Sequence, residues 1–456
     1  MSPNVRHILV CGLGFGDEGK GSVTDFLVRK FDAELVVRYN GGPQAAHNVV
    51  APIGRTGKAI HHCFAQFGAG TLAGADTYLS EFMAVDPLAL MAEARVLTQK
   101  GINPFDKLII DEECILVTPF HQLMNRLREL LRGSQRHGSC GMGVGEAILD
   151  MERSRPGVRL RDLMSPGIVT KLQELQDFKI DEASKLLATT DLKEPQAVIN
   201  GKTDRVEMDS RHQSATAAEI VADLENPALL RIFLERLVPF LESIRIGNRN
   251  DLIDMLRKKR SIFEGAQGVL LDRDAGFFPY VTPSRTTFAN ALEILKHNSD
   301  EFLRLGVLRG YMTRHGAGPL VSEIDTPSSQ DLKDEHNHDG PWQGALRVGW
   351  FDAVAGRYAL SVSEVDGLAI SNIDRLPRDA RICRAYRVPS GKISNLPLGD
   401  SGKKPGKSEL TQLVFEAAPI FAPLDPVRAA EQISEELNRK LLLISNGPGP
   451  ENKTWL

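Results

Sequence analysis

The stretch GLGFGDEGKGS at residues 12–22 decides the fold of this chain. An apolar run, HILVC at residues 7–11, precedes it, and another, LVVR, lies at residues 35–38. Between them, apolar side chains recur at helical spacing: Val23, Phe26, Leu27 and Phe31. Strand, glycine-rich turn, helix and strand in this order are typical of a βαβ opening. We therefore predict an α/β fold with a large, mainly parallel central sheet, a P-loop-like phosphate loop and helical insertions.

The rest of the chain continues this alternation of helices and strands. Amphipathic patterns predict helices at residues 84–97 and 121–131, and the charged residues 170–260 are expected to be mostly helical. Short apolar runs predict further buried strands at residues 261–263, 307–308, 368–370 and 441–444. Residues 389–407 are rich in Gly, Pro, Ser and Lys, which predicts a surface loop.

The composition is that of a globular chain and excludes some classes of partner. The 456 residues carry 55 Lys and Arg against 59 Asp and Glu, a net charge of −4. A binder of nucleic acid or of anionic membranes would show a basic excess, so we expect neither partner. We also expect no signal peptide and no membrane span, because no apolar run approaches roughly 18 residues. The five scattered cysteines, without a CxxC pair, indicate a reducing cytoplasm.

The first loop matches part of the dinucleotide-binding fingerprint. The match is Gly14-x-Gly16-x-x-Gly19, but the fingerprint also requires an acidic residue near the end of the second strand. Here that strand ends in Arg38, and the acids lie inside the loop itself. Negative charge beside a pyrophosphate is repulsive unless a metal intervenes. An oxidoreductase with a Rossmann fold therefore remains only as an alternative.

The same loop also matches most of the P-loop pattern, as Gly14-x-x-x-x-Gly19-Lys20. Gly21 stands where the pattern has Ser or Thr. We predict a phosphate cradle of main-chain N–H groups, to which Lys20 adds a positive charge. Asp17 then has two possible tasks, to hold Mg²⁺ or to accept a proton from a substrate. A plain glycine turn is the alternative without function.

A second polar loop, RYNGGPQAAHN at residues 38–48, follows the second predicted strand. The carboxyl ends of parallel strands meet at one edge of a sheet, so this loop should lie beside the first. His47 could donate a proton or a hydrogen bond to charge that develops on a transferring phosphoryl group. A structural role for this histidine is the alternative.

Six blocks of sequence resemble the adenylosuccinate synthetase family and follow its order along nearly the whole chain. The first loop resembles the family's W-G-D-E-G-K-G-K and the second its G-G-x-N-A-G-H-T. The remaining blocks are FEGAQGVLLD at 263–272 with PYVT at 279–282, TRHGAGP at 313–319, GWFD at 349–352 and ISNGP at 444–448. The chain is treated as a single domain over residues 1–456, with a helical insertion at about 120–260. By this resemblance the C-terminal part, at about 360–456, binds the base of GTP.

The resemblance implies a ligase that uses GTP to phosphorylate the 6-oxygen of IMP and then displaces the phosphate with an amino-acid amine. It makes Asp17 the base that removes the N1 proton and a ligand of Mg²⁺, with the main-chain carbonyl of Ala46 as a second ligand. His47 becomes the acid at the 6-oxygen, and Lys20 stabilises the transferring phosphoryl group.

The resemblance also implies binding residues for both nucleotides. The GTP site would comprise Gly16, Gly19, Lys20, Gly21, Asn372, Asp374, Ser445 and Gly447, with Asp374 accepting hydrogen bonds from the guanine base. The nucleoside monophosphate site would comprise Gln44, Ser139, Cys140, Arg155, Gln267 and Thr282. In the family, the residue that corresponds to Arg155 reaches the site of the partner subunit, so a homodimer is implied.

The departures from the family cluster at the amine-donor site. The family's T-T-G-R-x-R-R-x-G-W is PWQGALRVGW here, at residues 341–350, and of its arginines only Arg347 remains. Met142 replaces another arginine, and His315 replaces a valine. His315 and Arg347 are thus the candidate amine-donor residues. Residues 334–339, DEHNHD, could add ligands or a metal, or form a solvated loop.

Three alternatives to the family's usual activity therefore stay open. The amine donor could differ from aspartate, because arginines that pair with carboxylates are missing. The purine substrate could be GMP or dGMP. The chain could also bind nucleotides without catalysis.

Overall fold

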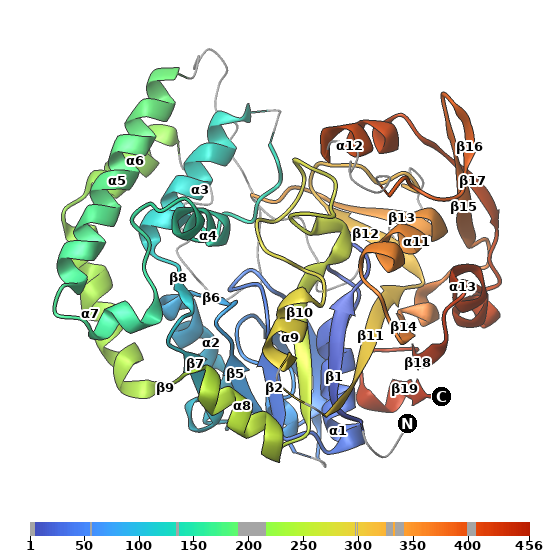
Figure 1. Cartoon of the computed structure of the whole chain (residues 1–456), viewed down its shortest axis with the longest axis horizontal. Helices are drawn as coiled ribbons and strands as arrows, with labels where there is room; N and C mark the ends of the chain where they lie inside the picture. Colours follow the sequence, from blue (N-terminus) through green and yellow to red (C-terminus); the bar gives the residue numbers. More distant parts are fainter. Residues whose placement is uncertain are drawn as a thin grey trace.

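The computed structural model describes residues 5–54, 57–133, 136–189, 216–296, 298, 300–324, 332, 342–398 and 407–456. Its main feature is a central sheet, ten-stranded within these residues, in the order β19-β18-β14-β11-β1-β10-β2-β5-β7-β9 (Figure 1). All neighbours in it are parallel except β18 and β19. The strands span β1 Val5–Gly12, β2 Leu35–Arg38, β5 Asp76–Leu79, β7 Leu108–Asp111, β9 Arg245–Gly247, β10 Ser261–Gly268, β11 Glu301–Arg309, β14 Gly367–Ser371, β18 Leu441–Ser445 and β19 Lys453–Trp455.

The predicted α/β class with a mainly parallel sheet is confirmed. β1 contains the predicted strand at residues 7–11, and β2 matches residues 35–38. Successive side chains of β1 are buried on opposite faces: Leu9 and Cys11 join the largest apolar cluster, and Ile8 and Val10 join a cluster with helix α1. β1 and β2 are not neighbours, because β10 lies between them and pairs with both.

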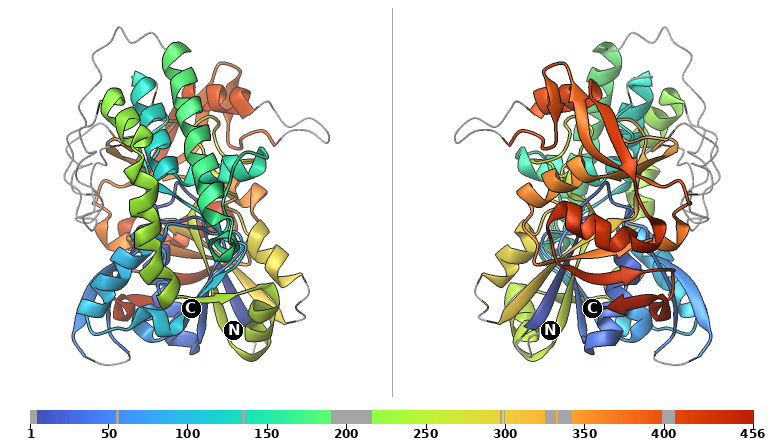
Figure 2. Two further views of the ribbon diagram at one scale, coloured as in Figure 1. Left: turned by 90° about the vertical axis from the view of Figure 1, so that its left-hand side faces the viewer. Right: turned by 90° about the vertical axis from the view of Figure 1, so that its right-hand side faces the viewer.

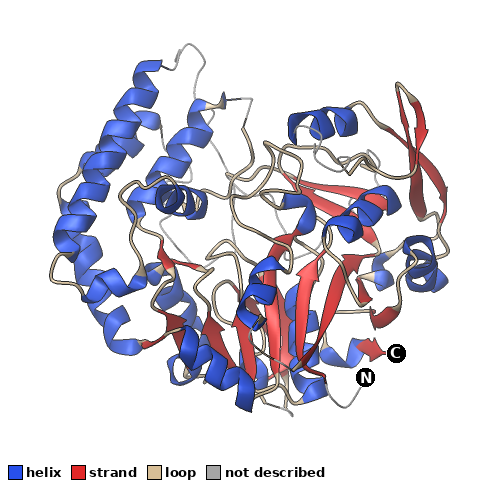
Figure 3. Ribbon diagram, in the orientation of Figure 1, coloured by secondary structure: helices blue, strands red, loops and turns tan. Residues whose placement is uncertain are grey.

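Helices cover the sheet and form a separate group at one end of it, where α3, α5, α6 and α7 stand side by side (Figures 1 and 3). The helices span α1 Lys20–Phe31, α2 Pro87–Gln99, α3 Pro119–Leu131, α4 Val144–Glu152, α5 Ile168–Thr189, α6 Ala217–Glu225, α7 Ala228–Ser243, α8 Arg249–Lys258, α9 Ala289–Leu295, α11 Ala353–Val362, α12 Lys407–Phe415 and α13 Ala429–Leu437. None of the helices in the described ranges is long and apolar enough to cross a membrane.

Two sequence predictions need correction. The helix expected at residues 84–97 begins only at Pro87, because Ala84–Val85 form the short strand β6, and the Asp86 side chain caps α2 by accepting from the N–H groups of Leu88 and Ala89. Residues 170–189 and 216–260, the described part of the stretch at 170–260, are mostly helical as predicted, and they also include the strand β9, which pairs with β7 at the edge of the central sheet. The surface loop expected at 389–407 contains the short strand β16 Gly391–Ile393, and its residues 399–406 lie outside the described chain.

Smaller sheets extend the molecule beyond the central sheet. The largest joins β12 Tyr311–His315, β13 Leu346–Asp352, β15 Arg381–Val388, β16 and β17 Ala418–Pro423. β3 His47–Pro52 and β4 Ala59–Phe64 form a hairpin, and β6 pairs with β8 Ile115–Leu116. The side views show the start of β1 and the C-terminal end of the chain near the base of the molecule (Figure 2). Residues 334–339, which sequence analysis singled out, lie outside the described residues.

A buried lysine links the helices of the insertion. Lys179 of α5 is fully buried, and its ammonium lies 3.2 Å from Glu146, 2.8 Å from Asp150 and 3.1 Å from Glu182. Burial alone would raise the pKa of Asp150, but the neighbouring His121 ring and the hydrogen bond and charge of Lys179 lower that pKa below its ordinary value. One cation therefore compensates several carboxylates from α4 and α5.

We predict that Lys179→Met lowers the free energy of unfolding by about 3–5 kcal/mol, because it removes the buried cation nearest to the buried Asp150 carboxylate and leaves only the partly exposed Arg128 and Arg155 in this network. Urea unfolding monitored by circular dichroism measures this change. The matched control is Lys185→Met on the same helix, where the exposed pair with Asp181 should be worth at most about 0.5 kcal/mol. Equal stability of the two variants would contradict the prediction.

Candidate active site

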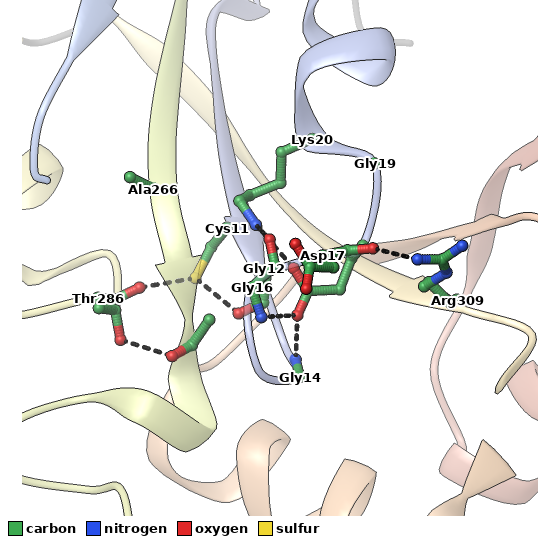
Figure 4. A network of polar contacts seen from close by, with 12 residues as sticks. Cys11, Gly12, Gly14, Gly16, Asp17, Gly19, Lys20, Ala266, Thr286 and Arg309 are labelled. Carbon is green, nitrogen blue, oxygen red and sulfur yellow. Dashed lines mark hydrogen bonds and ion pairs between the residues drawn. The ribbon is translucent and has the colours of Figure 1, made fainter. Parts of the chain in front are cut away.

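The phosphate loop leaves β1 and ends at α1, whose first residue is Lys20. The carboxylate of Glu18 lies within the loop, where its Oε1 accepts hydrogen bonds from the N–H groups of Gly14 (3.0 Å) and Gly16 (2.7 Å). The buried Lys20 ammonium lies 2.7 Å from both Glu18 Oε2 and the Gly16 carbonyl oxygen (Figure 4). N–H groups and an ammonium thus converge on one anion, as in a phosphate cradle, and in this structure that anion is Glu18.

Two glycines allow other segments to approach this loop closely. Gly16 has φ +117°, and a Cβ atom there would lie 3.2 Å from Cα of Gln267. A Cβ atom on Gly21 would lie 2.6 Å from Cβ of His47. The first loop, the second loop and the FEGAQG block on β10 therefore meet at the carboxyl edge of the sheet, as the sequence predicted for the two loops.

His47 is the first residue of β3, and the Glu264 carboxylate of β10 holds its ring. The His47 Nδ1 atom lies 2.6 Å from Glu264 Oε1, while Glu264 Oε2 accepts a hydrogen bond of 2.9 Å from the N–H of Ala69. Arg38, the last residue of β2, has its Nε atom 3.9 Å from Glu264 Oε2. Glu264 and Arg38 are completely buried. These contacts fix the imidazole through its Nδ1 atom.

Burial and charge set the protonation states of this pair. Burial lowers the pKa of His47 below its ordinary value, although the Glu264 carboxylate opposes the shift. Burial alone would raise the pKa of Glu264, but His47 and Arg38 lower it below its ordinary value. A neutral imidazole therefore donates its Nδ1–H to an ionised carboxylate, and its Nε2 carries a lone pair.

Asp17 is the more accessible acid of the phosphate loop, with 27% of its side chain exposed. Arg309, the last residue of β11, donates a hydrogen bond of 3.0 Å to its main-chain carbonyl (Figure 4). His315, the last residue of β12, places Nε2 3.5 Å from Asp17 Oδ2. The structure therefore brings one predicted amine-donor residue against the predicted base.

The residues predicted for the guanine base lie at the ends of two neighbouring parallel strands, β14 and β18. Ser371 of β14 donates a hydrogen bond of 2.7 Å to the main-chain carbonyl of Glu18. This bond connects the end of β14 to the phosphate loop. Asn372 follows with φ +56°, and Asp374 is exposed. Ser445 of β18 donates a hydrogen bond of 3.2 Å to the carbonyl of Gly447.

Three residues predicted for the nucleoside monophosphate lie near this edge of the sheet. Gln267 accepts a hydrogen bond of 3.0 Å from Ser284, whose hydroxyl lies 3.2 Å from that of Thr282. Gln44 lies two residues after Gly42, whose backbone closely approaches β6. Both polar atoms of the Gln44 amide are buried and have no hydrogen-bond partner among the described residues. A buried amide without partners is costly, so this group points to a ligand.

The other three lie toward the helical insertion. Ser139 and Cys140 lie in the segment between α3 and α4, and Ser139 accepts a hydrogen bond of 2.7 Å from Asn125 of α3. Arg155 follows α4, and its guanidinium lies 2.9 Å from Glu182 of α5. Within this single chain, Arg155 thus belongs to the ion-pair network around Lys179.

Arg347 is half-buried and is held by neighbouring groups. Its Nε donates a hydrogen bond of 2.8 Å to Glu323, and Arg347 pairs across β12 and β13 with Arg314. Burial and the charge of Arg347 lower the pKa of Arg314 to about 9. Together the two guanidinium groups donate hydrogen bonds to every main-chain carbonyl of the 316–319 loop. Arg347 binds the carbonyls of Gly316 (3.0 Å) and Gly318 (2.7 Å). Arg314 binds the carbonyls of Ala317 (3.2 Å) and Pro319 (3.1 Å).

Sequence reasoning did not assign several of these charged residues. Glu264, Arg38 and Glu18 are buried ionisable residues at the ends of apolar strands or within a glycine loop. That pattern was available as a signal, since charged side chains are seldom fully buried unless they are paired. Glu18 finds its partners within its own loop, but those of Glu264 and Arg38 come from distant parts of the chain and could not be read from it.

Comparison with known proteins identifies the family. A sequence model described as "Adenylosuccinate synthetase" matches residues 9–446. The chain belongs to the adenylosuccinate synthetase family. This confirms the resemblance of the sequence blocks, and the family consists of GTP-dependent ligases that join IMP and aspartate through a C–N bond.

Individual members of the adenylosuccinate synthetase family match the chain over its length. Adenylosuccinate synthetase 1 of Pseudoalteromonas translucida is 31% identical and covers 97% of both chains. The enzyme of a Cyanothece species is 32% identical over 94% of this chain and 87% of its own. These identities are far above chance yet leave room for a changed site.

Two solved structures share the fold. Fully ligated adenylosuccinate synthetase from Plasmodium falciparum has a TM-score of 0.73 at 20% identity and covers 99% of this chain and 100% of its own. Succinoaminodeoxyadenylate synthetase of cyanophage S-2L, bound to dGMP and to dATP as an energy donor, has a TM-score of 0.58 at 15% identity, with 99% and 95% covered.

We predict that Gly21→Ala lowers activity by about 100-fold, because the added methyl group displaces His47 from the phosphate loop. Steady-state GDP release measures the effect. Gly167→Ala is the matched control, since a Cβ atom there meets no atom closer than 3.8 Å. Full activity of Gly21→Ala would show that the contact between the two loops is dispensable.

Proposed function

We propose that this chain is a GTP-dependent ligase that phosphorylates the 6-oxygen of an IMP-like purine nucleoside monophosphate and displaces the phosphate with an amino-acid amine. The contact of His47 with Gly21 carries this proposal. It places a buried imidazole, held by Glu264, against the turn that contains Asp17 and Lys20. An acid, a base and a phosphate cradle at one edge of the sheet are the groups that this chemistry needs.

The first half of the reaction converts a poor leaving group into a good one. Asp17, as base, removes the N1 proton, so that the 6-oxygen becomes nucleophilic. Lys20 and the amides of Gly19 and Gly21 stabilise charge on the transferring phosphoryl group. His47 must gain a proton before its Nε2 can donate to the 6-oxygen, and the negative phosphoryl groups of bound substrates would raise its pKa toward that state.

The residues at the phosphate loop suit Mg²⁺. Asp17 offers a partly exposed carboxylate and Ala46 a main-chain carbonyl, both oxygen ligands of the kind that Mg²⁺ prefers. The described residues contain no cluster of three or more metal-binding side chains, which fits an ion held in part by substrate phosphates. When bound, Mg²⁺ would neutralise charge on the phosphates of GTP.

For the nucleoside monophosphate, we propose that Gln44, Ser139, Cys140, Gln267 and Thr282 form the site. The unpartnered amide of Gln44 supports this assignment most directly. Arg155 would serve the site of a partner subunit, which makes the enzyme a homodimer. We expect the enzyme to be located in the cytoplasm. For GTP, Asn372, Asp374, Ser445 and Gly447 would surround the base.

A specific observation favours an amine donor other than aspartate. Arg347, which alone remains of the family's arginine pattern, is occupied by Glu323 and by the 316–319 loop. Leu346, at the preceding arginine position of the pattern, is buried, and Gly344 holds the first arginine position. Each lost charge-assisted hydrogen bond to a substrate carboxylate would cost about 1.5–3 kcal/mol.

We predict GDP release that depends on a purine nucleoside monophosphate and an amine, with aspartate no better than a monocarboxylic amino acid. The assay combines GTP with IMP, GMP or dGMP and with aspartate, glycine or alanine, and mass spectrometry identifies the product. Absence of GDP release in every combination would argue for a silent nucleotide-binding relative. Efficient turnover with aspartate would show that the missing arginines are replaced.

We also predict that Asp374→Asn reduces the preference for GTP over ITP, which lacks the 2-amino group. The carboxylate accepts hydrogen bonds that the 2-amino group offers, so its loss should lower the ratio of kcat/KM values for GTP and ITP by about tenfold. Asp379→Asn, at an exposed position nearby, is the control. An unchanged ratio would remove Asp374 from the base site.

A further inference from the structure

His315 lies where it can act on the catalytic carboxylate. Its Nε2 is 3.5 Å from Asp17 Oδ2, and the exposed fractions of the two side chains are 11% and 27%. The family's sequence block has valine at this position, and valine cannot form a polar contact with a carboxylate. The contact between His315 and Asp17 is therefore a feature of this chain that the family block does not encode. The His315 ring therefore faces an acid that remains accessible to substrate.

One short segment holds Asp17 at two points. Arg309, at the end of β11, binds the main-chain carbonyl of Asp17 at 3.0 Å. β12 begins two residues later and ends at His315, which approaches the Asp17 side chain. The guanidinium of Arg309 also stacks on the ring of Tyr311, 4.5 Å from its centre. Backbone and side chain of Asp17 are thus both positioned by residues 309–315.

The 316–319 loop fixes His315 from its other side. Arg347 and Arg314 bind all four carbonyls of this loop. The Arg314 guanidinium lies 4.3 Å from the centre of the Phe15 ring, which belongs to the phosphate loop itself. The strand that carries His315 is therefore attached to the phosphate loop two residues before Asp17, which holds the two side chains near each other.

We propose that His315 is a positioning residue for Asp17. Its Nε2–H directs Oδ2 of the carboxylate, so that Oδ1 is presented to the N1 proton of the purine. An accessible aspartate without such a partner samples several rotamers, and only some of them are productive. The proposal rests on the proposed role of Asp17 as the base. It differs from the expectation drawn from sequence, in which His315 binds the amine donor.

The test compares His315→Val, which removes the donor, with His315→Gln, whose amide N–H can take the place of Nε2–H. We expect His315→Val to lower kcat by about tenfold or more, as for loss of a charge-assisted hydrogen bond. The KM values for GTP, the nucleoside monophosphate and the amine donor should change less than twofold. His315→Gln should recover most of kcat, and the exposed His61→Val serves as control.

The possible results separate the alternatives. A rise in KM for the amine donor at unchanged kcat would assign His315 to that substrate and overturn the proposal. Equal losses in the Val and Gln variants, or full activity of both, would also overturn it. The melting temperature and GTP affinity of each variant show whether the site remains folded, and His315→Leu replaces the Val variant if that one is unstable. An inactive wild-type enzyme would remove the proposed function, and this inference with it.

Discussion

The buried carboxylate of Glu264 is the charge around which the candidate site is built. A carboxylate inside a protein is tolerated only when hydrogen bonds and an opposite charge compensate its lost hydration. Here the compensation comes from His47 of β3, the N–H of Ala69 and Arg38 of β2. Because Glu264 lies on β10, between β1 and β2, these contacts attach the second loop to the centre of the sheet. His47 is thereby delivered to the phosphate loop that leaves β1.

The phosphate loop shows how two acids can lie beside a phosphate site. Glu18 is compensated internally by Lys20 and by two main-chain N–H groups, so it adds little net negative charge. Asp17 is directed outward, toward His315. The separate roles of Glu18 and Asp17 also explain why the dinucleotide pattern is misleading here. The residue that ends β2 is Arg38, which serves Glu264 rather than a ribose.

The two sides of the site differ in how far they follow the family. The side proposed for phosphate transfer keeps the aspartate, lysine and histidine of the family blocks. Each of these three side chains lies beside a partner of opposite or complementary charge. On the side proposed for the amine donor, Arg347 supports the 316–319 loop. Trp342, where the family pattern has a threonine, is buried, and a Cβ atom on Gly141 would lie 2.8 Å from its ring. In the proposed function, the phosphorylation chemistry and the choice of amine therefore depend on different residues of this fold.

The sequence by itself determined the βαβ opening, the phosphate loop and the family, because these are encoded in local spacing: glycines in a turn, apolar residues at helical and strand periods, and contiguous blocks. It also placed Asp17, Lys20 and His47 at one edge of a parallel sheet. The sequence did not reveal that β10 separates β1 from β2, that Glu264 and Arg38 hold His47, or that Arg347 turns to Glu323. Only the tertiary structure decided these points, because a buried charge selects its partner by proximity in space, and residues such as Asp17 and His315 become neighbours only when distant strands pair.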